Sequence, residues 1–228
     1  MTSAFRTAAA AILALALVGC SAAPASTLPA TACPTSAPTA DAAGGILADA
    51  RRAVVATSLG TFTIELDASS APIATANFVA LARCGFYAGI TFHRVLAGFV
   101  AQAGDPQTKT RRGPFDGLGT GGPGYQFGVE FPSDQQSYDK DVVAMANGID
   151  YDPATGEIRG GTDTNGSQFF IDLASLAGQL RPYYSVIGKV TEGTDVVDTI
   201  GAVPVNDPQA GVPVEPVIIE SVSIGSGA

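Results

Sequence analysis

Hydrophobic and polar positions alternate through residues 54–67, which read VVATSLGTFTIELD. Phe62, Ile64 and Leu66 are separated by threonine and glutamate, which is the period-two pattern of a half-buried β-strand. The glycine-containing residues 58–60 interrupt the pattern, so we predict two strands joined there by a tight turn. Other short apolar runs predict strands at 90–95, 99–103, 142–146, 167–171, 185–190 and 217–224.

The apolar period changes to that of a helix at residues 70–84. Ser70 is the expected N-cap, Pro72 suits the first turn, and Gly85 ends the helix. The face expected to be buried carries Ile73, Ala76, Ala80, Leu81 and Cys84. A second helix is expected at 194–200, with Thr194 as its cap and Val196, Val197 and Ile200 facing inward.

These elements favour a single mainly β domain over residues 51–228. No linker or change of composition divides this part of the chain. Many strands, two helices and glycine-rich connections predict a closed or nearly closed β-barrel with helices at its ends. The patterns leave the order of the strands in the sheet open.

The first 50 residues have a different composition. In residues 1–19 a single arginine, Arg6, precedes an apolar run of 8–18, which is too short for a bilayer span of about 20 residues and is typical of a secretory signal. The sequence LVGC at 17–20 resembles a bacterial lipobox, in which the chain is cut before a cysteine that then carries a lipid. This resemblance implies export, lipidation of Cys20 and attachment to the outer face of the cell membrane; the alternatives are an ordinary signal peptide or a short anchor. Residues 20–50, rich in Ala, Pro, Ser and Thr, are expected to be a tether.

Charge and residue counts exclude several kinds of site. The formal net charge is −9 and the basic residues form no stripe, which argues against nucleic-acid binding. A single histidine, His93, excludes any site that needs two imidazoles, and we expect it to be structural. Residues 119–124 match GxGxxG, but Pro123 lies inside the motif and no helix start follows, so we interpret it as a turn. We expect no cofactor and no metal, and we interpret the acidic run 134–152 as a solvated loop.

The chain has three cysteines, Cys20, Cys33 and Cys84. With Cys20 assigned to the lipid, Cys33 and Cys84 could form a disulfide in an oxidising compartment. The alternative is a buried, unpaired Cys84 at the end of the first helix. The residues leave both open.

One arginine lies within an apolar stretch, FHRVLAGFVAQAGD at residues 92–105. Strand periodicity places Phe92 and Arg94 on one face, and Phe99 and Gln102 follow after a turn at Gly98. Burying an unpaired guanidinium is costly, so Arg94 either pairs with a core carboxylate or donates hydrogen bonds into a concave apolar pocket.

Four segments together resemble the cyclophilin family. FHRVLAGFVAQAGDP, GTGGPGYQFGVEF, VAMAN with TNGSQFFI, and YSVIGKVTEGTDVVDTI are similar to cyclophilin motifs, in the family's order, over about residues 53–226. The resemblance implies a closed eight-stranded antiparallel barrel capped by two helices. It also implies a peptidyl-prolyl cis/trans isomerase that needs no cofactor, acts as a monomer and takes proline-containing polypeptides as its partners.

The same resemblance assigns site residues. Arg94 matches the family's catalytic arginine, and we group Gln102 and Phe92 with it. Gln102 is expected to orient Arg94 and to hydrogen-bond the substrate, and the backbone of Asn147 is expected to pair with the peptide before the proline. The positions that match the substrate groove are Phe99, Val100, Ala146, Asn147, Phe170, Leu180 and Tyr184.

The chain departs from the family pattern beside this groove. Residues 148–163 form an insertion where the family has only a few residues, and Gln179 stands where the family often has an aromatic residue that contributes to cyclosporin binding. Weaker cyclosporin binding is therefore expected. An alternative hypothesis is a module that binds proline-containing segments, or a chaperone, with little turnover.

Overall fold

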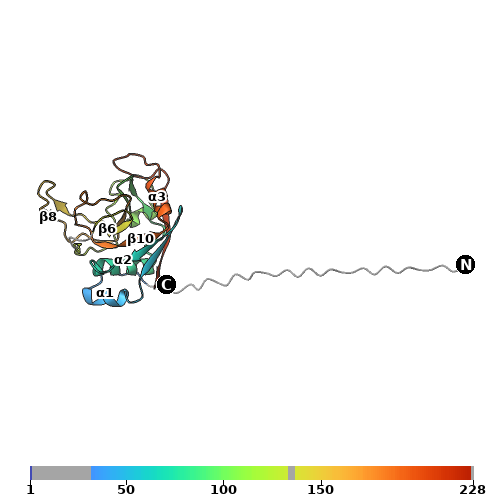
Figure 1. Cartoon of the computed structure of the whole chain (residues 1–228), viewed down its shortest axis with the longest axis horizontal. Helices are drawn as coiled ribbons and strands as arrows, with labels where there is room; N and C mark the ends of the chain where they lie inside the picture. Colours follow the sequence, from blue (N-terminus) through green and yellow to red (C-terminus); the bar gives the residue numbers. More distant parts are fainter. Residues whose placement is uncertain (2–31, 133–136, 227–228) are drawn as a thin grey trace.

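The computed structural model describes Met1 and residues 32–132 and 137–226 of the 228-residue chain. Its main feature is a curled antiparallel sheet with α1 and α2 side by side at one end and α3 on another side (Figure 1). The helices are α1 (Ala40–Ile46), α2 (Pro72–Arg83), α3 (Thr194–Gly201) and the short 3-10 helix η1 (Pro106–Lys109).

The strands follow the hydrogen-bonded order β3-β11-β1-β2-β10-β6-β9-β5-β4. Their bounds are β1 (Arg52–Thr57), β2 (Gly60–Leu66), β3 (Thr91–Phe92), β4 (Arg94–Leu96), β5 (Val100–Ala103), β6 (Val142–Met145), β9 (Phe169–Asp172), β10 (Val186–Glu192) and β11 (Val217–Gly225). Each range predicted from the apolar pattern overlaps at least one of these strands. All neighbouring strands run antiparallel, as the resemblance implied.

The two edge strands of the sheet, β3 and β4, are separated along the chain by His93 alone. β3 pairs with β11 and β4 pairs with β5, so one short segment connects both edges and the sheet curls into a nearly closed barrel. The prediction of a closed eight-stranded barrel was therefore wrong in two respects. The sheet has nine strands, because the segment is split where it changes partner at His93, and the barrel is not fully sealed.

The interior of the barrel is filled by large apolar side chains. Phe62, Ile64, Phe92, Phe169 and Ile171 are all at most 1% exposed and belong to one continuous core. Their removal from water is the main term that stabilises such a domain. The period-two pattern of β2 is thereby explained, because Phe62 and Ile64 face this core.

The first long helix, α2, begins one residue later than predicted, and Ser70 is not its cap. The N-cap position is Ala71, which makes no side-chain capping bond. The Glu130 carboxylate instead accepts hydrogen bonds from the backbone N–H groups of Ile73 and Ala74, at 3.1 and 2.8 Å. A carboxylate at this end satisfies free N–H groups and interacts favourably with the helix dipole.

The second predicted helix is present as α3, but Thr194 is not its cap either. The N-cap is Gly193, whose backbone has φ = 72°. A Cβ atom at this position would collide with the backbone of Thr61 and Phe62, so the close approach to β2 requires glycine. The expected inward residues Val197 and Ile200 are fully buried.

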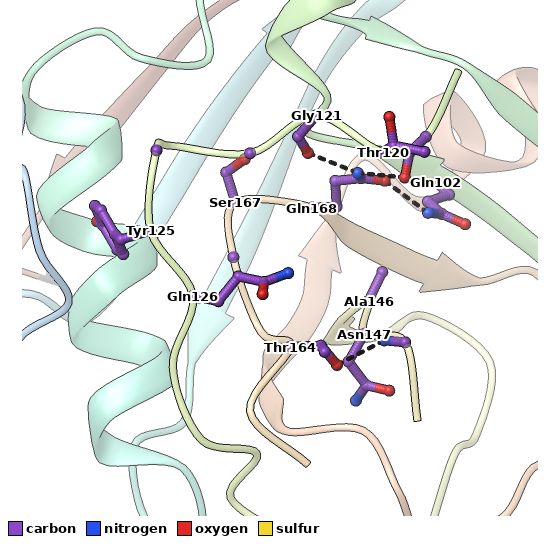
Figure 2. A pocket seen from close by; sticks show the side chains of 15 residues that line it. Gln102, Thr120, Gly121, Tyr125, Gln126, Ala146, Asn147, Thr164, Ser167 and Gln168 are labelled. Carbon is purple, nitrogen blue, oxygen red and sulfur yellow. Dashed lines mark hydrogen bonds between the residues drawn. The ribbon is translucent and has the colours of Figure 1, made fainter. Parts of the chain in front are cut away.

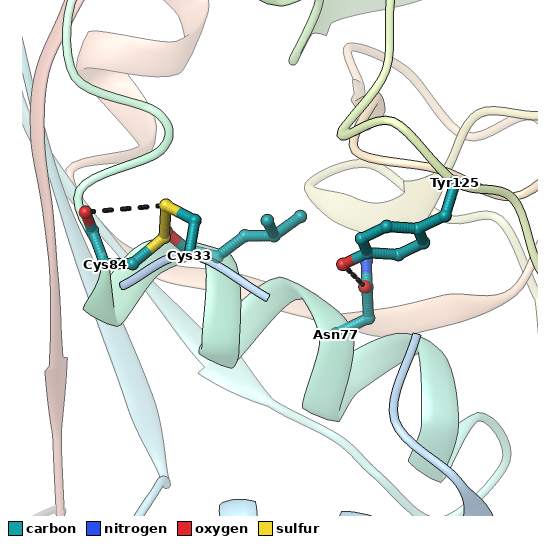
Figure 3. The surroundings of a disulfide bond; sticks show 5 residues. Cys33, Asn77, Cys84 and Tyr125 are labelled. Atoms are coloured by element: carbon teal, nitrogen blue, oxygen red, sulfur yellow. Dashed lines mark hydrogen bonds between the residues drawn. A yellow bond between two sulfur atoms is a disulfide. The ribbon is translucent and has the colours of Figure 1, made fainter. Parts of the chain in front are cut away.

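Part of the segment predicted to be a tether is folded onto the domain. Residues 40–46 form α1, which packs against α2, and Arg83 of α2 pairs with Asp49 at 2.6 Å. Cys33 and Cys84 form a disulfide, so the first of the two cysteine alternatives holds (Figure 3). The prediction of a tether over 20–50 is thus corrected for residues 33–50, whereas Cys20 and most of the signal segment lie outside the described residues.

The insertion at 148–163 forms a small hairpin of β7 (Asp150–Tyr151) and β8 (Ile158–Gly160), separate from the barrel sheet. It projects from one side of the molecule (Figure 1). Within the described ranges, no helix has the length and apolar character needed to cross a membrane.

Candidate active site

A cavity of about 180 Å³ opens on the outer face of the barrel, over β4, β5, β6 and β9. Its lining is Arg94, Phe99, Val100, Gln102, Ala146, Asn147, Phe170, Leu180 and Tyr184. All nine positions were singled out in the sequence. The structure therefore brings together residues that are up to 90 positions apart along the chain.

Phe92 is the one predicted site residue that does not line this cavity. It is 1% exposed and lies in the barrel core, where its ring meets that of Phe169 edge-on with centroids 6.3 Å apart. The strand break at His93 explains why Phe92 and Arg94 do not share a face as expected.

The apolar wall of the cavity is built by strand register. Gln102 pairs with Phe170, and Val100 pairs with Asp172, across the β5–β9 ladder. Successive side chains of β9 point to opposite faces, so Phe169 and Ile171 enter the core whereas Phe170 faces the cavity. The Phe170 ring stands perpendicular to the Tyr184 ring at 5.2 Å, which fixes both side chains.

Arg94 supplies the only cationic side chain among the nine. It is half-buried and sits directly opposite Gln102 in the β4–β5 pairing. Burial lowers the pKa of the guanidinium below its ordinary value, but an arginine remains charged in proteins. Among the described residues the guanidinium takes part in no hydrogen bond or ion pair, so its N–H groups are available to a ligand.

Gln102 is hydrogen-bonded to a residue that the sequence did not single out. Its side-chain amide donates to Gln168 Oε1 at 2.9 Å (Figure 2), and no hydrogen bond joins it to Arg94 in the described part of the chain. Gln168 in turn donates to the carbonyl oxygens of Gly119 and Gly121, at 2.7 and 2.8 Å. This chain of hydrogen bonds ties the glycine-rich loop to β5 beside the cavity.

A second and larger cavity, of about 640 Å³, adjoins the first. The two share Gln102, Ala146 and Asn147, and the second is otherwise lined by residues between 119 and 126, by Gly148 and by residues from 164 to 168 (Figure 2). Sequence reasoning missed these positions because GTGGPGY was interpreted only as a turn. Its match to a family loop was the signal that could have identified them.

His93 is 4% exposed and is not part of the nine-residue lining. Burial, as the largest cause, lowers its pKa to about 4, so the ring is uncharged at neutral pH. In the parts of the chain that the structure describes, no group of three or more His, Cys, Asp or Glu side chains is placed to hold a metal ion.

Comparison with known proteins agrees with this geometry. Residues 52–224 match the family model described as cyclophilin type peptidyl-prolyl cis-trans isomerase/CLD. A peptidyl-prolyl cis-trans isomerase of Helicobacter pylori is 39% identical over 159 residues, covering 68% of this chain and 82% of its own. Peptidyl-prolyl cis-trans isomerase B of Streptomyces anulatus is 35% identical over 195 residues, covering 78% and 98%.

Solved structures give the same result. A cyclophilin type peptidyl-prolyl cis-trans isomerase of Cryptosporidium parvum superposes with a TM-score of 0.64 at 31% identity, covering 78% of this chain and 99% of its own. The same Cryptosporidium protein, crystallised in the presence of the dipeptide Ala-Pro, gives a TM-score of 0.62 at 31% identity, with coverage of 77% and 99%. The chain belongs to the cyclophilin family and is a cyclophilin-type peptidyl-prolyl cis-trans isomerase.

Proposed function

We propose that the chain isomerises X-Pro bonds of proteins outside the cytoplasmic membrane, assists their folding as a lipid-anchored monomer, and uses Arg94 to stabilise the twisted amide. The observation that carries the proposal is a half-buried guanidinium at the edge of an apolar cavity large enough for a proline ring, with no hydrogen bond or ion pair to any described residue. The Ala-Pro dipeptide present with the Cryptosporidium relative supports this kind of ligand.

The mechanism follows from amide chemistry. Resonance gives the C–N bond double-bond character and a rotation barrier of about 18–20 kcal/mol, so X-Pro bonds isomerise over roughly tens to hundreds of seconds. At the 90° twist, resonance is lost and the prolyl nitrogen regains a lone pair. A guanidinium N–H aimed at that nitrogen binds the twisted state better than either planar isomer, which lowers the barrier without a covalent intermediate.

The other cavity residues hold the substrate in place. Phe99, Val100, Phe170 and Leu180 enclose the proline ring. Gln102 and the backbone of Asn147 hydrogen-bond the peptide on either side of the rotating bond. Arginine suits the central role because it stays charged and its planar donors are easily fixed in direction.

The place of action is argued from the N-terminal segment. The secretory pattern of 1–19 and the lipobox-like LVGC support export and lipidation of Cys20. The Cys33–Cys84 disulfide adds support, because disulfides persist mainly in oxidising compartments.

A second candidate function is a module that binds proline-containing segments with little turnover. The β7–β8 hairpin beside the cavity favours it, since Gly148 and Thr164 at its base line the adjoining cavity and could extend the contact with a bound chain. Catalysis and mere binding are separated by the rate of isomerisation.

The test is the prolyl isomerisation rate of an X-Pro tetrapeptide with the purified full-length chain. We expect acceleration by the wild type and a loss of about 10²- to 10³-fold in kcat/KM for Arg94→Ala, which is typical of removing one donor to a transition state. Arg112→Ala, which removes an exposed guanidinium outside the cavity, is the matched control and should retain full activity. A folded wild type that binds the peptide but does not accelerate its isomerisation would favour the binding module.

A further inference from the structure

The hairpin of residues 148–163 is attached at its base to the edge of the active site. The Gly148 backbone N–H donates to the Thr164 hydroxyl at 2.8 Å, and both residues line the cavity of about 640 Å³. Ile149, the next residue, donates its backbone N–H to Asn147 Oδ1 at 3.2 Å. Asn147 lines both cavities, so the insertion begins inside the site.

The tip of the hairpin contacts residues 181–183, in the connection from β9 to β10. Arg181 donates from Nη2 to the carbonyl oxygen of Pro153 at 3.0 Å, and the Tyr183 hydroxyl donates to the carbonyl oxygen of Gly156. The Arg181 guanidinium also lies close over Gly156, where an added Cβ atom would force that side chain to shift.

Aromatic contacts reinforce the same attachment. The Tyr151 ring of β7 lies edge-on to the Tyr183 ring at 5.3 Å, and the Arg181 guanidinium is 5.6 Å from the Tyr151 ring centroid. Edge-on ring contacts and cation–π contacts of this kind restrict the rotation of all three side chains.

The attached residues lie between two groove residues. Leu180 comes directly before residues 181–183 and Tyr184 directly after them, and both line the cavity of about 180 Å³. The connection from β9 to β10 contains no helix or strand, so its path depends on individual contacts. Asn147 adds one more, because its Nδ2 donates to the carbonyl oxygen of Tyr183 at 2.8 Å.

We propose that the β7–β8 hairpin is a positioning element of the X-Pro cavity, and that Arg181 and Tyr183 are positioning residues through which it sets the places of Leu180 and Tyr184. The inference rests on the proposed function, since it assigns to the insertion a part in binding the proline. Neither residue touches the cavity, so each acts through its chain neighbours.

The first experiment is steady-state isomerisation of an X-Pro tetrapeptide by the full-length double variant Arg181→Gln/Tyr183→Phe. We expect kcat/KM to fall about tenfold, mostly through a higher KM, because two hydrogen bonds that fix the cavity wall are lost. Arg112→Gln is the matched control and should leave both constants unchanged. Arg181→Lys keeps a donor for the Pro153 carbonyl oxygen. Its kcat/KM should therefore be higher than that of Arg181→Gln.

The second experiment reads position directly. In NMR spectra of the full-length protein, the methyl signals of Leu180 and the ring signals of Tyr184 should move in the double variant and stay in place in Arg112→Gln, with the melting temperature changed by only a few degrees. Unmoved Leu180 and Tyr184 signals together with kcat/KM within twofold of wild type would overturn the inference. If the wild type has no isomerase activity, the proposed function fails, while the NMR comparison still decides whether the hairpin positions the cavity wall.

Discussion

Asp172 places a buried carboxyl group at the end of β9. It is 0% exposed, and neither oxygen has a hydrogen-bond partner among the described residues. The titratable groups that face it are Asp139 and Tyr138, so no cation compensates the charge. The pKa of Asp172 is raised to about 8. Burial is the larger cause, and the negative charge of Asp139 is the smaller one.

This pKa makes stability depend on pH in a defined direction. Below about pH 4 Asp172 is protonated in both the folded and the unfolded chain, so it does not make the free energy of unfolding depend on pH. Between about pH 4 and pH 8 the folded chain retains a proton that the unfolded chain releases, so stability falls as pH rises. Asp172→Asn should abolish this fall and raise the urea midpoint at pH 8.

The measurement is the urea midpoint from pH 5 to pH 9 for wild type, Asp172→Asn and the control Glu220→Gln, which alters an exposed carboxylate. The control should follow the wild type. Parallel curves for wild type and Asp172→Asn would show that Asp172 does not titrate in this range.

The difference between Arg94 and Asp172 shows what sequence can predict at the residue scale. The nine cavity residues could be assigned because they lie in segments similar to a family whose site is known. Asp172 could not be identified, because a polar residue in an alternating strand normally indicates a solvent-facing side. Here that side is covered by Tyr138 and the following loop, and this contact between distant segments is invisible in the local pattern.

At the scale of elements, helix α2 depends on a residue far away in sequence. Glu130 caps its first turn through two backbone N–H groups, although 57 positions separate Glu130 from Ile73. Local capping patterns predicted Ser70 instead, because sequence rules consider only residues within a few positions of the helix start. The same limit explains the wrong cap at Thr194, where close packing against β2 decides in favour of Gly193.

Replacement of Glu130 should destabilise this helix end. We expect Glu130→Ala to lower the free energy of unfolding by about 1–2 kcal/mol, because two N–H groups lose their acceptor and the dipole loses a counter-charge. Glu130→Gln retains an acceptor and should cost less. Urea unfolding gives the size of the effect, and faster amide hydrogen exchange at Ile73 and Ala74 gives its location.

Glu157→Ala, at an exposed hairpin position, is the control for this series and should be close to neutral. If Glu130→Ala is no more destabilising than Glu157→Ala, the cap contributes nothing measurable.

At the scale of the whole molecule, the barrel was predictable and its N-terminal addition was not. Strands with alternating apolar and polar residues form a sheet with one apolar face. Because that face is stable only when buried, the pattern indicates a curled sheet. Thr39 is a local cap signal for α1, but residues 40–46, ADAAGGI, contain two glycines and no apolar stripe, so the local pattern is too weak to predict the helix. Its position is fixed by tertiary contacts, namely packing on α2, the Arg83–Asp49 ion pair and the nearby disulfide.

The disulfide should contribute strongly to the stability of the domain. It joins residues 51 positions apart, and in the chain-entropy model a loop of this length corresponds to about 4 kcal/mol at most. We expect Cys33→Ser/Cys84→Ser, or reduction of the wild type, to lower the urea midpoint. The double variant should not respond to reductant, and equal midpoints for oxidised and reduced wild type would contradict the expectation.

The Cys33–Cys84 bond also changes what a protease can release. It closes a covalent ring that includes α1, β1, β2 and α2. A single cut anywhere between residues 34 and 83 therefore leaves both pieces joined, and a lipid at Cys20 would still hold the catalytic domain. If Cys20 carries the proposed lipid, release of the intact domain requires cleavage between Cys20 and Cys33, or cleavage within the ring together with a reductant.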